Sequence, residues 1–405
     1  MLPNGWSKYV LGDIVAFRNG LNFTKSDTGE EIKIVGVADF KKRSKIENFI
    51  DLESIKVASK VRDLDLLKSG DILFVRSNGN KELIGRCLYF PHVADRISFS
   101  GFTIRGRVNT SLIEPEFASY LMRSKFVTDQ IFLGGSGTNI SNLSQEILSN
   151  IEVKIPVIIE QRKIAKILLT WDEAIRINEG LLKNITNQKL SLMQKILTGK
   201  ERIGGNSEAW REYSLGDLFS ERVETGKVDL PLLSITREEG VIPREQVGRK
   251  DTSNDDKTKY QKIYHGDIGY NTMRMWQGVS ALSEYEGIIS PAYTVLAPAE
   301  KINTKFASYL FKFKPIIFLF YRFSQGLVSD TWNLKYKNFS KIKVFIPNIQ
   351  EQKKIAEIFE TADEELAAIN LIIKRLKEEK SALMNQLLTG RRRVHLPDSE
   401  TVAQA

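Results

Sequence analysis

One stretch of 48 residues occurs twice in this chain of 405 residues, first at 155–202 and again 191 residues later at 346–393. The two copies align without a gap and share about 20 identical positions. The shared positions include an Ile-Pro start, Glu-Gln, Lys-Ile-Ala, Asp-Glu, Leu-Met and a closing Leu-Thr-Gly. A match of that length and register does not arise by chance, so the chain is a tandem duplication. Any fold it adopts must place two equivalent segments in equivalent surroundings.

Each copy is predicted to form one long helix. Pro156 and Pro347 precede the periodic region, where proline is tolerated, and Gly199 and Gly390 follow it, where a glycine cap belongs. Between these marks, apolar residues recur every seven positions with a second set offset by three or four, which is typical of a coiled coil. The predicted seam consists of Ile164, Leu168, Trp171, Ile175, Leu182, Ile185, Leu192 and Ile196 in the first copy, and of Ile355, Phe359, Leu366, Ile369, Ile373, Leu376, Leu383 and Leu387 in the second.

Two interpretations differ in what each apolar stripe packs against. A single amphipathic helix covers its own globular domain, whereas two equivalent helices in one chain favour pairing with each other, and we expect an antiparallel coiled coil. Lys189 and Lys380 interrupt both seams at the same position. A lysine there fixes the register, contacts a partner, or simply extends its ammonium group to solvent.

The composition limits the class of protein. No apolar run is long enough to span a membrane, and the N-terminus lacks the apolar region of a signal peptide, so a cytoplasmic location is expected. A single cysteine, Cys87, excludes an internal disulfide, and with only three histidines a Cys/His metal site is not expected. The net charge of +9 fits nucleic-acid binding, but no dense basic block is present, so folding must assemble any phosphate-binding face.

The predicted domains follow the repeat. Residues 1–154 form a first globular domain of short strands and helices and 203–345 a second; 155–202 and 346–393 are the helices, and 394–405 are a disordered tail. Three shorter motifs also recur: Leu-Gly-Asp at 11–13 and 215–217, Gly-Asp-Ile at 70–72 and 266–268, and Phe-Ala-Ser-Tyr-Leu at 117–121 and 306–310. The fold class is therefore two α/β (α+β) domains in tandem, each followed by a long helix.

The helices are alike, whereas the loops of the globular domains are not. Antiparallel pairing would relate the two halves by an approximate two-fold axis. A DNA duplex carries the same pseudo-symmetry, and paired readers use it to contact two half-sites. Because the loops of the two domains differ, the two half-sites are predicted to differ in sequence.

This layout resembles the specificity subunit of type I restriction–modification enzymes over nearly the whole chain. The most specific parts are the segments 155–165 and 346–356 (Ile-Pro to Lys-Ile-Ala), the closing Leu-Thr-Gly and the Gly-Asp-Ile loops. The resemblance implies that each globular domain is a target recognition domain for one half of a split site in double-stranded DNA. It implies that the paired helices fix the gap and dock methyltransferase subunits.

The same resemblance implies a non-catalytic chain without a cofactor of its own. S-adenosylmethionine, ATP and Mg are expected on the partner methyltransferase and restriction subunits, with no membrane involved. We find no Walker-type nucleotide motif and no Asn-Pro-Pro-Tyr-like methyltransferase motif. Glu152-Val153-Lys154 matches half of a nuclease site, but the repeat equivalent, Lys343-Val344-Phe345, lacks both ligands. A stand-alone nuclease or methyltransferase, and a coiled-coil scaffold for two protein-binding domains, are the alternatives.

Candidate DNA contacts lie in loops that differ between the halves. Arginine, asparagine and glutamine make bidentate contacts to base edges, and glycine permits close approach of the backbone. The candidates are Arg76, Ser77, Asn78, Gly79 and Asn80 after the first Gly-Asp-Ile; Arg274, Met275, Trp276 and Gln277 after the second; Thr138 and Asn139, with Trp332 in the equivalent loop; and the basic cluster Lys41, Lys42 and Arg43. Ordinary surface turns, with Trp276 in the core, account for the same pattern.

Overall fold

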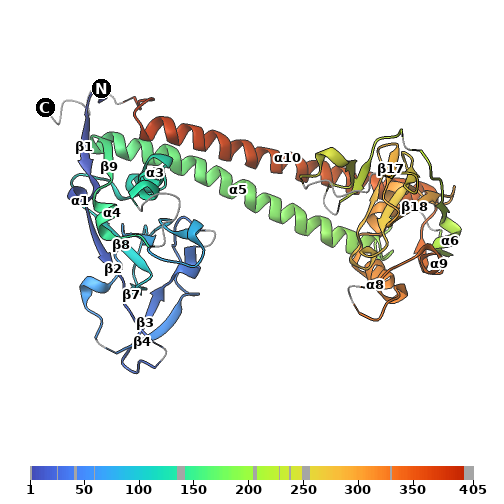
Figure 1. The fold of residues 1–405 in the computed structure, drawn as a ribbon, viewed down its shortest axis with the longest axis horizontal. Coiled ribbons are helices and arrows are strands. Elements are labelled where there is room, and N and C mark those ends of the chain that lie inside the picture. Colours follow the sequence, from blue (N-terminus) through green and yellow to red (C-terminus); the bar gives the residue numbers. More distant parts are fainter. Residues whose placement is uncertain are drawn as a thin grey trace. The chain divides into compact units, whose positions relative to one another are not determined.

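The computed structural model describes residues 2–24, 26–40, 43–58, 60–134, 142–203, 208–227, 229–236, 239–248, 256–328 and 331–395. The chain divides into two compact units: unit 1 is Met1–Asn178 with Ile372–Ala405, and unit 2 is Glu179–Leu371. Each unit combines a globular domain with part of both long helices, α5 (Ile158–Ile196) and α10 (Ile349–Leu388) (Figure 1). The predicted boundary at 154/155 falls inside a strand that unit 1 retains.

Both long helices begin two residues after the predicted proline and end before the predicted glycine. Gly199 and Gly390 have φ values of +71° and +70°, the left-handed conformation of a helix C-terminal cap. All sixteen residues of the predicted seam are buried or half-buried. The prediction of two long, capped helices is confirmed.

The helices run antiparallel within each unit. The ion pairs that join them or their C-terminal extensions are Glu160–Arg393 and Asp172–Lys380 in unit 1, and Lys189–Asp363 and Arg202–Glu351 in unit 2. In each unit, the residue of α5 or its extension with the higher number pairs with the residue of α10 or its extension with the lower number, as antiparallel helices require. Figure 1 shows α5 (green) and α10 (red) side by side.

The helices also close the globular cores. In unit 1, Ile164 and Leu168 of α5 and Leu387 of α10 belong to the main core cluster. In unit 2, Ile196 of α5 and Phe359 of α10 do the same. Both interpretations of the apolar stripes therefore hold, because each helix packs on its own domain and on the other helix.

Unit 1 is built on a four-stranded antiparallel sheet of order β2-β8-β5-β6, with a three-stranded sheet β4-β3-β7 and a ribbon β1-β9 (Figure 1). The ribbon delivers the chain to α5. The elements are β1 (Trp6–Val10), α1 (Leu11–Ile14), β2 (Val15–Asn19), β3 (Glu30–Val35), β4 (Glu53–Val57), β5 (Ile72–Val75), β6 (Cys87–Tyr89), β7 (Ile97–Phe99), β8 (Thr103–Val108), α2 (Pro115–Met122), α3 (Lys125–Gly134), α4 (Gln145–Ser149) and β9 (Glu152–Pro156).

Unit 2 repeats this plan with a sheet of order β11-β18-β15-β16, the pairs β12-β13 and β14-β17, and a ribbon β10-β19 that leads into α10. The elements are β10 (Arg211–Ser214), α6 (Leu215–Leu218), β11 (Phe219–Arg222), β12 (Leu233–Ile235), β13 (Val241–Pro243), β14 (Gln261–Ile263), β15 (Ile268–Asn271), β16 (Ser280–Leu282), β17 (Gly287–Ile289), β18 (Tyr293–Pro298), α7 (Thr304–Leu310), α8 (Lys314–Phe323), α9 (Tyr336–Phe339) and β19 (Lys343–Ile346).

Two consecutive helices of unit 1 are separated by a serine. α2 stops at Met122 and α3 starts at Lys125. The hydroxyl of Ser124 donates to the carbonyl of Leu121 at 2.7 Å and accepts from the N–H of Val127 at 3.4 Å. A serine that bonds to the backbone on both sides ends one helix and starts the next. In the described part of the chain, no helix combines the length and apolar character needed to cross a bilayer.

Candidate nucleic-acid interface

The repeated Gly-Asp-Ile motif forms the turn before each candidate loop. Its glycine has a φ of +90° in both copies, a conformation that other residues adopt only with strain. The buried carboxylate of Asp71 accepts two hydrogen bonds from Arg107, at 2.8 and 2.7 Å. Asp267 accepts two from Arg222, at 2.8 and 3.0 Å. The motif therefore anchors β5 and β15, whose far ends carry the loops, and its acidic residue is part of the scaffold.

In unit 1 the first loop leaves β5 at Arg76. The Arg76 N–H donates to the carbonyl of Phe102 at 2.8 Å, and the guanidinium lies 3.4 Å from the carbonyl oxygen of Gly101. Phe102 is 62% exposed and so presents an aromatic ring beside the arginine. Sequence reasoning missed Phe102, because a phenylalanine at the start of a strand gives no signal that separates an exposed ring from a core one.

The two asparagines of this loop shape its turn. Asn78 Oδ1 accepts from the N–H of Asn80 at 2.8 Å, and Asn80 Oδ1 accepts from the N–H of Glu82 at 3.1 Å, at the start of the 3₁₀ turn η3 (Lys81–Leu83). A bidentate contact to adenine also uses the amide oxygen. These oxygens must therefore accept a second hydrogen bond to read a base. Ser77 is half-buried, and Gly79 is exposed with open space where a Cβ would lie.

In unit 2 the corresponding loop contains the 3₁₀ turn η5 (Met275–Gln277). Arg274 is exposed, and Trp276 and Gln277 are half-buried. The structure corrects the prediction for Met275: its side chain is completely buried in the core of unit 2 and cannot contact DNA. The 3₁₀ turn points three consecutive side chains in different directions, so one of them faces inward.

Trp276 belongs to a cluster of aromatic rings. Its indole N–H donates to the carbonyl of Met273 at 3.0 Å, and its ring meets that of Trp332 edge to face at 5.1 Å. Trp332 contacts Tyr321 at 4.9 Å, and Tyr321 contacts Phe318 at 6.1 Å. Tyr321 and Phe318 lie on the exposed side of α8 and were missed by sequence reasoning, although their spacing of three places them on one helix face.

In both units the residues that follow the second candidate loop lie next to the first loop. The N–H of Leu143 donates to the carbonyl of Arg76 at 2.8 Å in unit 1, and the N–H of Leu334 donates to the carbonyl of Thr272 at 2.9 Å in unit 2. The structure therefore brings together loop regions that are about 60 residues apart in sequence. The predicted residues Thr138, Asn139, Lys41 and Lys42 lie outside the described residues.

Arg43, the described member of the basic cluster, is exposed. It lines a cavity of about 420 Å³ together with Arg86 and Arg123, at the end of the β5–β6 hairpin. Three arginines that line one cavity suit a phosphate, and the Arg123 guanidinium also donates to the carbonyl of Ser119 at 2.8 Å. Cys87 also borders this cavity, and burial raises the pKa of its thiol to about 11, so the thiol stays protonated at neutral pH.

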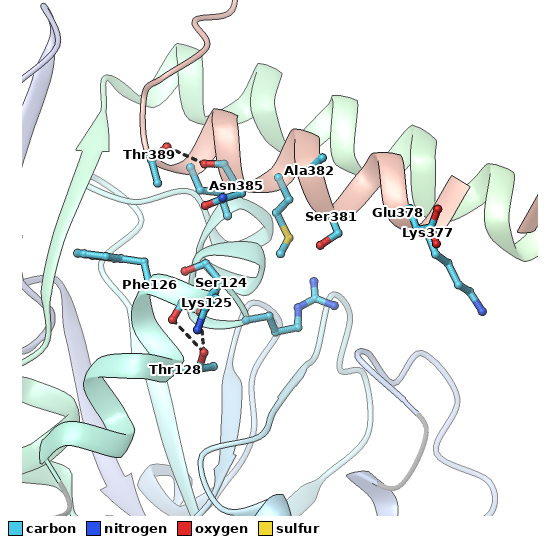
Figure 2. A pocket seen from close by; sticks show the side chains of 13 residues that line it. Ser124, Lys125, Phe126, Thr128, Lys377, Glu378, Ser381, Ala382, Asn385 and Thr389 are labelled. Atoms are coloured by element: carbon cyan, nitrogen blue, oxygen red, sulfur yellow. Dashed lines mark hydrogen bonds between the residues drawn. The ribbon is translucent and has the colours of Figure 1, made fainter. Parts of the chain in front are cut away.

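A larger cavity of about 750 Å³ lies in unit 1 between the start of α3 and the C-terminal turns of α10. Figure 2 shows Lys125 and Phe126 on the α3 side and Ala382, Asn385 and Thr389 on the α10 side. Phe126 is exposed, and Leu388 and Met384 add apolar surface. Partly basic and partly apolar, this groove suits a protein side chain better than a DNA backbone.

Comparison with known proteins gives a family match over most of the chain. Residues 3–187 and 207–378 match the model of the type I restriction modification DNA specificity domain. The chain is 25% identical over 432 residues to the putative type I restriction enzyme MjaX specificity subunit of Methanocaldococcus jannaschii, covering 97% of this chain and 95% of that protein. It is 28% identical over 214 residues to the StySPI specificity subunit of Salmonella potsdam, covering 51% and 44%.

Solved structures share the fold. A chain from a structure of a type I R-M system aligns with a TM-score of 0.60 at 18% identity, covering 97% of this chain and all of that one. The HsdS subunit from Thermoanaerobacter tengcongensis aligns with a TM-score of 0.52 at 16% identity, covering 96% and 98%. The expected fold class, two tandem domains with two long helices, is confirmed.

Proposed function

Because the chain belongs to the family of type I restriction–modification DNA specificity domains, we propose that each of its units reads one half of a bipartite site in double-stranded DNA. The chain is a specificity subunit and not the catalytic one. The observation that carries the proposal is the contrast within the chain. Two copies of one scaffold, held by the same Gly-Asp-Ile turn, present loops of different length and chemistry.

The contacts differ in kind between the units. In the proposed complex, Arg76 of unit 1 reads a base edge, Phe102 packs on sugar or base, and Arg43 with the arginines that line the same cavity binds a phosphate. In unit 2, Arg274 and Gln277 supply the polar contacts, and the Trp276–Trp332 pair supplies an aromatic surface for the DNA. Two half-sites of different sequence follow from two different sets of side chains.

The test is a map of modified bases. The chain is co-expressed with its methyltransferase subunit, and the DNA is sequenced by a method that detects methylated adenine. We expect a motif of two short half-sites around a fixed gap. Replacing residues 1–154 with the recognition domain of another specificity subunit must then change one half-site and leave the other. A change in both half-sites, or in neither, would contradict the proposal.

A methyltransferase subunit is the proposed partner on the helix pair. The groove between α3 and α10 supports this, because the exposed Phe126 lines it together with Met384 and Leu388 and gives it an apolar part that a partner side chain can occupy. Phe126→Asp is expected to weaken capture of the methyltransferase subunit while leaving intrinsic DNA affinity unchanged. Phe102→Asp is the matched control, with the opposite expectation. Equal loss of both activities in both variants would indicate misfolding and not separate surfaces.

Cofactors belong to the partners in this proposal. S-adenosylmethionine is expected on the methyltransferase subunits, and ATP and Mg on the restriction subunits. The nuclease alternative for Glu152 is weakened by its surroundings, since its carboxylate is 2.7 Å from the ammonium of Lys8 in a two-stranded ribbon. The scaffold alternative predicts no DNA affinity at any salt concentration, whereas the proposed function predicts affinity that falls steeply as salt rises.

A further inference from the structure

Lys189 interrupts the apolar seam of the first long helix, and Lys380 interrupts that of the second. Lys380 lies in a cluster of three residues in unit 1. Its ammonium lies 2.5 Å from Asp172 Oδ1 of α5 and 5.2 Å from the ring centre of Tyr120 in α2. The Tyr120 hydroxyl donates to Asp172 Oδ2 at 2.7 Å. One carboxylate therefore joins three elements: α5, α10 and the globular domain.

Unit 2 contains the same cluster built from the equivalent residues. Lys189 of α5 pairs with Asp363 of α10 and lies 5.0 Å from the ring centre of Tyr309 in α7. The Tyr309 hydroxyl donates to Asp363 Oδ2 at 2.8 Å. In both clusters the aspartate and the tyrosine come from one repeat, and the lysine comes from the other.

The lysines do not simply extend into solvent. Their side chains are only 16% exposed for Lys380 and 14% for Lys189, and both ammonium groups have a carboxylate partner. Burial lowers the pKa of Lys380, whereas Asp172 acts in the opposite direction. Burial beside Asp172 raises the pKa of Tyr120, which therefore remains a hydrogen-bond donor. A paired charge in a seam is costly to displace into apolar surroundings.

The sequence around Lys189 discriminates against a register slipped by one heptad, whereas the same slips place Lys380 opposite Ala165 in one direction and Glu179 in the other. An antiparallel slip of one heptad places Lys189 opposite residue 356 or 370, which are Ala356 and Asn370. Ala356 lies in the apolar core of unit 2. Neither Ala356 nor Asn370 has a carboxylate, so a slip leaves the ammonium of Lys189 without its acidic partner. Apart from Trp171 and Phe359, the apolar seam residues are isoleucine and leucine, which resemble one another from heptad to heptad, so the charge pairs add a distinction that most of the seam lacks.

We propose that the clusters Tyr120–Asp172–Lys380 and Tyr309–Asp363–Lys189 select the register of α5 against α10 and orient each globular domain on the helix pair. They thereby determine the length of the gap between the half-sites; this last step rests on the proposed function. The tyrosines couple domain orientation to helix register, because each shares its aspartate with the lysine.

The test uses Lys189→Met with Lys380→Met in the full chain. Methionine fills the seam without a charge, so the protein is expected to fold. The control is Lys183→Met with Lys374→Met, a second repeat-equivalent pair that lies exposed on the same two helices. Spin labels at Thr170→Cys and Glu379→Cys, in a Cys87→Ser background, report the register within unit 1 without requiring any activity.

The seam variant is expected to show a second distance population and the control a single one. Among modified DNA sites, the seam variant is expected to produce motifs whose gap differs by about three base pairs, the length of one heptad at about 1.5 Å per residue. The charge exchange Asp172→Lys with Lys380→Asp, made together with Asp363→Lys and Lys189→Asp, should restore one register.

A seam variant with a single distance and the original gap would overturn the inference. If the unmodified chain supports no DNA modification at all, the proposed function fails. The spin-label distances still decide whether the clusters select the register.

Discussion

Arg202 donates two hydrogen bonds, at 2.8 and 2.7 Å, to the carboxylate of Glu351, which is fully buried at the start of α10. The repeat-equivalent pair, Arg393 and Glu160, has the same geometry at 2.8 and 2.9 Å. The Glu-Gln motif at the start of each helix thus holds the end of the other helix's segment. The buried glutamate of each repeat is therefore paired with an arginine from the other repeat.

The pair predicts an asymmetric response to mutation. Arg202→Met leaves the buried Glu351 carboxylate without a charged partner, with the N–H of Ile203 still donating to it at 3.3 Å. We expect a loss of about 3–5 kcal/mol in the free energy of unfolding of unit 2. Glu351→Gln leaves Arg202, whose side chain is 27% exposed and reaches water, so the loss should be smaller. Urea denaturation followed by tryptophan fluorescence measures both, since the Trp210 ring lies 6.0 Å from the Arg202 guanidinium. A larger loss for Glu351→Gln would contradict this account.

The same pair predicts a dependence on pH. The hydrogen bonds from Arg202 hold the pKa of Glu351 below its ordinary value of 4.5. Its contribution to stability is therefore complete above pH 4.5 and is lost as the pH falls through the lower, folded value. The free energy of unfolding should drop more steeply below pH 4.5 in the unmodified chain than in Glu351→Gln. Parallel curves would show that this carboxylate does not titrate with unfolding.

The glutamine of the Glu-Gln motif should be as sensitive to substitution. The Gln352 amide donates to the carbonyls of Lys301 and Pro347, at 3.1 and 2.9 Å, and accepts from the N–H of Asn303 at 2.8 Å. Gln352→Ala is expected to destabilise unit 2 by about 1–3 kcal/mol for each group left unpaired. Gln352→Glu should be no better, because it offers no donor to the two carbonyls. The exposed neighbour Gln350→Ala is the control and should leave the denaturation midpoint unchanged.

Cys87 is expected to report unfolding. Since burial raises the pKa of its thiol to about 11 and the side chain is nearly inaccessible, the folded protein should not react with a disulfide reagent between pH 7 and 9. In denaturant one thiol per chain should react. Rapid labelling of the folded protein would place Cys87 in a mobile part of unit 1.

Lengthening both helices equally tests the gap. One heptad inserted after Gly180 and one after Leu371, its repeat equivalent, keep all four members of both lysine–aspartate pairs in contact. The added 7 residues lengthen each helix by about 10 Å, so the gap between half-sites should grow by about three base pairs. Inserting a heptad in only one helix separates the lysine–aspartate pairs and should reduce DNA methylation. An unchanged gap after the paired insertion would show that the helices do not set it.

Local patterns were sufficient for the helices. Seven-residue periodicity, the prolines before it and the glycines after it give the ends of α5 and α10 to within a few residues, because these signals act over one or two turns. The short strands were also visible as apolar runs between turns. The break between α2 and α3 was not, since it depends on which backbone groups the Ser124 hydroxyl reaches.

The sites depended more on contacts between distant segments. The position of Met275 inside the core, the exposed ring of Phe102 and the aromatic contacts of Tyr321 all follow from packing that sequence spacing does not encode. The loops that contain Arg76 and Arg274 stay a prediction, which rests on their position where the two related domains diverge.

The sequence by itself determined that this protein is a duplication with two long helices, and its motifs were sufficient to identify the family. Those features are periodic or repeated, so they can be recognised one segment at a time. Only the tertiary structure decided what the repeated polar residues do. The partner of Glu160 lies 233 residues away in the sequence, and that of Lys380 lies 208 residues away. The Gln161 amide donates to carbonyls 5 and 49 residues away. A buried polar group must find its partner in space, and that partner is known only once the chain has folded.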